Sequence, residues 1–136
     1  MNPDPQARAK LLVWWIIWAA ILAGLVILYL AFGRGRPLPK PDGKDLLLNL
    51  AAVVPLFISI VIRWLVLPRF SGLGRALPMF IVGVALAEGC GIIGLFLGGP
   101  YRDALWFLGV LGVAQYAPFF AARLADPKPT GYIPNN

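Results

Sequence analysis

The chain contains no histidine and only one cysteine, Cys90, among its 136 residues. An intramolecular disulfide is therefore excluded, and so is any cysteine and histidine spacing of the kind that holds a metal ion. Cys90 lies inside an apolar run, where the simplest interpretation is a small packing residue. We expect neither a metal site nor a cofactor.

Charged residues are also scarce, at 13% of the chain, whereas hydrophobic residues make up 60%. Soluble domains are about 45–50% apolar and about 25% charged. The core of one small domain cannot bury such an excess, so the composition predicts that lipid surrounds the protein. The net charge is +6, but the basic residues occupy short segments between apolar runs. That distribution is typical of membrane proteins, and we expect no binding of nucleic acid.

Four apolar stretches are long enough to cross a bilayer, namely residues 11–32, 46–67, 77–97 and 104–122. Each of the first three measures about 32 Å as an α-helix, and a bilayer core is about 30 Å thick. The first stretch is longer than the apolar region of a signal peptide, so we interpret it as a retained helix. The sequence therefore predicts an all-α, polytopic membrane protein.

The four stretches define one transmembrane domain, residues 11–122, between a short segment 1–10 and a flexible tail 123–136 that contains three prolines. The connections are short, so successive helices are expected to run antiparallel in an up-down-up-down bundle. Seven of the 12 Lys and Arg residues fall on the side of the two termini, and five fall on the other side. This excess predicts a multi-pass protein of the inner (plasma) membrane with both termini in the cytoplasm.

Small residues recur along one face of the third stretch. At 100° per residue they form a narrow stripe, which consists of Gly83, Ala87, Gly91, Gly94 and Gly98. Small residues allow helix backbones to approach closely inside a membrane. We therefore expect this stripe to pack against a helix, either a neighbour in the same chain or part of a second copy.

One carboxyl group, that of Glu88, lies beside this stripe and near the middle of the third stretch. A charged carboxylate at that depth costs on the order of 2.5–3.5 kcal/mol. We therefore expect Glu88 to be protonated and hydrogen-bonded. In an antiparallel bundle the polar side chains nearest to its depth are Ser59, Gln115 and Tyr116.

Two features of the second stretch add to this environment. Pro55 lacks an N–H group and so frees the carbonyl of Ala51, which becomes a further hydrogen-bond acceptor for Glu88. Arg63 lies closer to the cytoplasmic side. Its long side chain either reaches toward Glu88 or extends outward to the lipid headgroups.

The segment "ALAEGCGIIGLFL", residues 85–97, resembles the carboxylate helix of the c subunits of rotary ATP synthases and of V-type proteolipids. In that family an Ala-x-Ala-Glu stretch precedes a leucine-rich half-helix that contains glycine. Its glutamate takes up and releases a proton or a sodium ion while the subunits form a ring. The resemblance implies that Glu88 is an ion-binding carboxylate, with Gln115 or Tyr116 as its partner. The whole chain is more similar to small four-helix bacterial membrane proteins that carry such a helix.

Two functions follow from these observations. The first is that of a non-enzymatic structural or accessory subunit, which packs through its third helix into a homo-oligomer or a larger membrane complex. The second is the binding or translocation of a proton or sodium ion by Glu88. A transport path requires polar side chains across the bilayer, and those here are few. We expect no enzymatic activity, because the sequence offers no nucleophile with a base, no metal cluster and no phosphate-binding loop.

Overall fold

The computed structural model describes residues 5–41 and 45–125, and within them it contains helices and no strand. The first segment is α1 (Pro5–Leu28), which continues as η1 (Tyr29–Gly33). The second is α2 (Asp45–Val61), which continues through η2 (Ile62–Val66) and η3 (Leu67–Arg69). The third is α3 (Leu73–Leu97). The fourth comprises η4 (Gly99–Tyr101), α4 (Arg102–Ala114), η5 (Pro118–Ala121) and α5 (Ala122–Ala125).

Four segments are long and apolar enough to cross a membrane: Pro5–Gly33, Leu46–Arg69, Leu73–Leu97 and Gly99–Leu124. This confirms the predicted all-α, multi-pass architecture. Of the expected tail, residues 123–125 belong to α5, and residues from 126 onward lie outside the described part of the chain.

Two helices begin at least four residues before their apolar stretches. α1 starts at Pro5, because proline suits the first helical turn and the polar residues after it are good helix formers. α3 starts at Leu73, directly after Gly72, whose φ of 95° is readily adopted only by glycine. Hydropathy alone marks the apolar part of a helix, and the polar first turns lie outside it.

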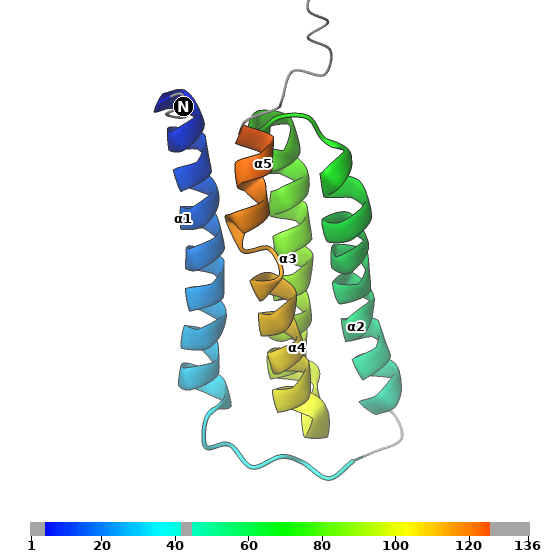
Figure 1. The fold of residues 1–136 in the computed structure, drawn as a ribbon. Coiled ribbons are helices and arrows are strands. Elements are labelled where there is room, and N and C mark those ends of the chain that lie inside the picture. The colour runs from blue at the N-terminus through cyan, green and yellow to red at the C-terminus, as the bar shows by residue number, and fades with distance from the viewer. Residues whose placement is uncertain (1–4, 42–44, 126–136) are drawn as a thin grey trace, which may run out of the picture.

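Helices α3 and α4 pack against each other at the centre, and α1 and α2 lie on opposite sides of this pair (Figure 1). The contacts also give the helix directions. Gly83 lies beside Tyr116 and Gly94 lies beside Leu105, so α3 and α4 run antiparallel. Trp14 stacks on Phe80 with ring centroids 4.3 Å apart.

Contacts further along the bundle complete this description. Leu25 of α1 lies beside Gly91 of α3, and Trp14 of α1 stacks on Phe80 of α3. Both helices advance by eleven residues between these two contacts, so α1 and α3 run parallel. Ser59 of α2 bonds to the carbonyl of Gly83, and Leu56 lies near Gly112 and Ala87. α2 is therefore antiparallel to α3. The side of the membrane that each end faces remains a prediction.

The small residues of α3 form the seam between α3 and the other helices. Gly83, Ala87, Gly91, Gly94 and Gly98 are all buried. A Cβ atom at Gly94 would collide with Leu105 of α4, and one at Gly91 would lie 2.9 Å from Leu25 of α1. The stripe therefore packs against neighbours in the same chain, which was one of its two expected partners.

The fourth segment is interrupted inside its apolar span. α4 ends at Ala114, and the chain resumes as a 3₁₀ turn at Pro118. Ala117 is extended, with φ −48° and ψ 126°, as the residue before a proline prefers. Non-helical backbone within a membrane requires hydrogen-bond partners from its surroundings. The interruption therefore gathers polar side chains from the neighbouring helices.

Candidate functional site

Tyr116 lies at the interruption of α4 and is fully buried. Its hydroxyl donates to the carbonyl oxygen of Ser59 at 2.5 Å, and the Ser59 hydroxyl donates to the carbonyl oxygen of Gly83 at 2.7 Å. The two hydroxyl oxygens are 3.3 Å apart. Because both protons are used within the chain, this cluster links α2, α3 and the end of α4. These hydrogen bonds therefore stabilise the packing of the helices inside the bundle.

Arg63 supplies a hydrogen-bond donor to the backbone where the fourth segment is interrupted. Its Nε donates to the carbonyl oxygen of Gln115 at 2.8 Å. The guanidinium carbon lies 3.8 Å from the centroid of the Phe120 ring and 5.0 Å from that of Trp64. Such positions over aromatic faces are favourable for a cation. Arg63 is therefore held at the interruption of α4 and does not pair with Glu88.

The side chain of Gln115 is oriented by an indole. Trp64 Nε1 donates to Gln115 Oε1 at 3.1 Å. An indole N–H is only a donor, so the amide must present its oxygen there and its nitrogen elsewhere. That nitrogen, Nε2, is buried and has no acceptor among the described residues. The interruption therefore holds an amide donor without a partner.

A groove of about 530 Å³ lies over these groups, and we call it the arginine groove. Among the residues that line it are Arg63, Trp64, Gln115, Phe119, Phe120 and Arg123. Trp64 is 61% exposed and Phe119 is 78% exposed, so the groove opens on the outer surface of the bundle. In residues 5–41 and 45–125 the ion pair found is Arg102–Asp103, at 3.0 Å. Neither arginine of the groove is paired with a carboxylate there.

Glu88 lies apart from this cluster. Helical spacing places it four residues after Val84 and three before Gly91, at the edge of the α3 face that meets α1. Its side chain is partly exposed, and within the described part of the chain it makes no hydrogen bond and no ion pair. The expected partners Ser59, Gln115 and Tyr116 thus meet one another but not Glu88.

The reason is the level at which the helices pack. The Ser59 and Tyr116 hydroxyls meet α3 at Gly83, more than one turn before Glu88 and on another face. The Ala51 carbonyl receives no hydrogen bond from Glu88 either, since Glu88 forms none among the described residues. Depth along a helix was estimated from the sequence, but the rotation of α3 was not.

Small residues lie near Glu88, and we call the part of the outer surface that they form with it the Glu88 surface. On α3 it includes Ala85, which is exposed, and Gly89. On α1 the residues Ala20 and Gly24 lie at about the same level as Glu88. This level follows from the contacts of Trp14 with Phe80 and of Leu25 with Gly91. A Cβ atom at Gly24 or Gly89 would meet nothing within 4 Å. This surface is therefore shallow and open.

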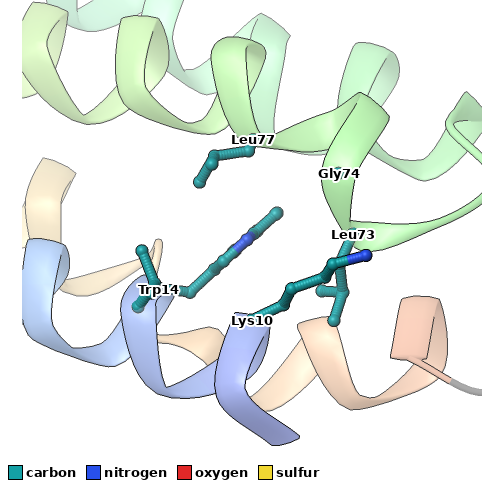
Figure 2. A pocket seen from close by; sticks show the side chains of 6 residues that line it. Lys10, Trp14, Leu73, Gly74 and Leu77 are labelled. Carbon is teal, nitrogen blue, oxygen red and sulfur yellow. The ribbon is translucent and has the colours of Figure 1, made fainter. Parts of the chain in front are cut away.

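Two further pockets are apolar. One, of about 170 Å³, lies between the start of α1 and the start of α3, where the Trp14 ring points toward Leu77 and Lys10 extends beside Leu73 (Figure 2). The other, of about 270 Å³, lies between α2 and α4 beside Asn49. Asn49 is 8% exposed, and neither of its side-chain polar atoms has a partner among the described residues. Apart from Asn49 and Tyr101, apolar side chains line this second pocket.

Cys90 is buried, and its sulfur lies 3.9 Å from the carbonyl oxygen of Leu105. The described residues contain no group of three or more His, Cys, Asp or Glu side chains that would hold a metal ion.

Neither a role for Arg123 nor the arginine groove was predicted from the sequence. The signal for the groove was present, since Arg63 lies within an apolar stretch and Gln115 is followed closely by Pro118. Comparison with known protein families, with curated proteins and with solved structures finds no match to this chain.

Proposed function

We propose that this chain is a non-enzymatic accessory subunit of a larger membrane complex, and that it docks on a partner helix through the Glu88 surface. One observation carries the proposal. Glu88 presents a carboxyl group on the outer face of α1 and α3, near the middle of a membrane-crossing segment, without a partner in the described chain.

Energetics favour a partner at this position. An unpaired carboxyl group in hydrocarbon is costly, and polar residues inside membranes usually meet another polar group. The small residues around Glu88 would let a second helix approach closely, and close approach drives helix association in lipid. The glycine stripe does not serve this purpose, because the other helices of the chain already cover it.

The partner is expected to supply a hydrogen-bond donor at the depth of Glu88. A different membrane protein fits better than a second copy of this chain. The exposed side chains of α2 and α4 at that depth, such as Val54, Phe57 and Leu111, are apolar. A second copy would therefore oppose Glu88 with apolar surface or with another carboxyl group.

Ion translocation is the weaker candidate. A bound sodium ion requires several oxygen ligands, and the polar groups of Ser59, Gln115 and Tyr116 lie away from Glu88 and bond within the chain. The proposal therefore assigns Glu88 to a helix contact.

Photo-crosslinking in the native membrane tests the proposal. A photoreactive residue at Ala85, beside Glu88, should trap a membrane protein, whereas one at the equally lipid-facing Val54 should not. Adding Glu88→Leu should abolish the crosslink, because leucine offers no hydrogen bond. A crosslink that survives Glu88→Leu, or no crosslink at Ala85, would contradict the docking surface.

A second measurement separates the two candidate functions. The purified chain alone, in liposomes, should carry no proton or sodium flux. A flux that is present in the unaltered chain and lost in Glu88→Gln would favour ion translocation instead, because glutamine keeps the shape of the side chain but cannot release a proton.

A further inference from the structure

We infer that the arginine groove binds the phosphate of an anionic phospholipid. The groove lies at the end of the bundle where α1 begins and α2 ends, as the contact of Trp15 with Phe119 shows, with ring centroids 5.1 Å apart. It is distinct from the Glu88 surface in residues and in depth.

The polar groups that face the groove are donors. Arg63 uses Nε within the chain, and its other N–H groups have no acceptor among the described residues. Arg123 is exposed and carries a second guanidinium. Gln115 also lines the groove, but its Nε2 is buried beneath the surface, without a partner among the described residues. A site with free guanidinium donors is complementary to an anion with several oxygens.

Phosphate has this chemistry. A guanidinium is planar and presents paired N–H groups that match two phosphate oxygens, so arginine is favoured where phosphate is bound. In the described chain no carboxylate competes for Arg63 or Arg123, since the ion pair found lies at Asp103. The two positive charges also favour a headgroup with a net negative charge over a zwitterionic one.

The surroundings favour a lipid as the source of the phosphate. Arg63 lies inside the apolar segment Leu46–Arg69, a few residues before its end. Trp64 and Phe119 flank the groove and are largely exposed, as aromatic residues at a membrane interface commonly are. Basic pockets between membrane helices bind anionic lipid headgroups. The headgroup would enter from the bilayer, with the acyl chains lying along the outer surface of α2.

The groove also explains an otherwise costly arrangement. A cation and a buried amide nitrogen without acceptors are unfavourable in hydrocarbon. A phosphate would give the free N–H groups of Arg63 an acceptor and would lie against the interrupted backbone of residues 115–117. The bound lipid would thus hold the end of the fourth segment against α2.

Native mass spectrometry of the full chain in detergent tests this inference, with phosphatidylglycerol as the probe. The unaltered chain should retain one phosphatidylglycerol molecule more tightly than phosphatidylcholine. Arg123→Gln, on an exposed side chain, should weaken retention roughly 10-fold or more, as expected for losing a hydrogen bond to a charged group. Arg63→Gln should do the same. Arg75→Gln is the matched control, because Arg75 is exposed at the same end but outside the groove.

Three results would overturn the inference. Equal retention of phosphatidylcholine and phosphatidylglycerol would remove the charge selectivity. An effect of Arg123→Gln no larger than that of Arg75→Gln would remove the assignment to this groove, even where Arg63→Gln fails to fold. Displacement of the lipid by millimolar inorganic phosphate would assign the site to a soluble anion in place of a lipid.

Discussion

Gly91 of α3 and Gly109 of α4 bring the two central helices into backbone contact. A Cβ atom built on Gly109 would lie 2.5 Å from Cα and 2.6 Å from N of Gly91. At Gly109 the obstacle is backbone, which cannot turn aside as a flexible side chain does, whereas a Cβ atom at Gly91 would first meet the Leu25 side chain, at 2.9 Å. This contact fixes how closely α3 and α4 pack.

Gly109→Ala should therefore destabilise the fold by about 1–3 kcal/mol, the range found when extra atoms are forced into a packed interior. Thermal unfolding in detergent measures the loss. Gly89→Ala is the matched control, since a Cβ at Gly89 would meet nothing within 4 Å. The control should lose no stability, because alanine favours a helix by about 1 kcal/mol over glycine.

Larger substitutions along the seam should act in the same direction. Gly91→Leu and Gly94→Leu are expected to separate the helices, because Leu25 and Leu105 occupy the space that the new side chains would need. If both variants kept the unfolding temperature of the unaltered chain, the close packing of α3 would be wrong.

The hydrogen bonds between Ser59 and Tyr116 lead to a second prediction. Tyr116→Phe removes the donor to the carbonyl of Ser59 and keeps the ring packed on Phe80, whose centroid is 5.9 Å away. We expect a loss of about 0.5–1.5 kcal/mol in unfolding free energy. Ser59→Ala should cost a similar amount, through its bond to Gly83.

A double-mutant cycle on these two residues measures their coupling. The hydroxyl oxygens are 3.3 Å apart, so the effects of Tyr116→Phe and Ser59→Ala should not add. Strict additivity would mean that the two hydroxyls act independently, against the geometry described above.

The sequence was sufficient to predict the membrane-crossing segments, because length and hydropathy depend on local composition alone. It also predicted that Gly83, Gly91 and Gly94 pack against a helix, since small residues at helical spacing share one face. Which helix covers them depends on the arrangement of the whole bundle. Here α4 and α1 do so, and that choice leaves the stripe internal.

The arrangement around Glu88 was not predictable in the same way. Counting residues from the helix ends gives approximate depth, and on that basis Ser59 and Tyr116 were expected near Glu88. The rotation of α3 about its axis instead directs Gly83 toward Ser59 and Tyr116, and it leaves Glu88 at the outer edge of the α1 contact. Close packing in the seam sets this rotation, and the sequence left open which helix would cover the stripe.

Asn49 provides a third prediction. Its side chain is 8% exposed, and neither polar atom has a hydrogen-bond partner within the described part of the chain. An unsatisfied buried polar group costs about 1–3 kcal/mol. Asn49→Leu should therefore raise the unfolding temperature in detergent, since leucine has the same branched skeleton and the neighbouring pocket, lined mostly by apolar side chains, can take its larger volume. A lower unfolding temperature would indicate that Asn49 has a polar partner in the folded protein.

The orientation in the membrane is the last prediction. Residues 34–41 connect α1 to the second segment, and Ser71 lies at the other end of the bundle between η3 and α3. The excess of basic residues on the side of the termini predicts that the first connection is outside and Ser71 inside. With Cys90 replaced by alanine, Leu38→Cys should react with a membrane-impermeant thiol reagent on intact cells, because Leu38 is 48% exposed. Ser71→Cys should react only after the cells are permeabilised. The reverse pattern would invert the orientation, and labelling of both positions from one side would contradict a membrane crossing between them by Leu46–Arg69.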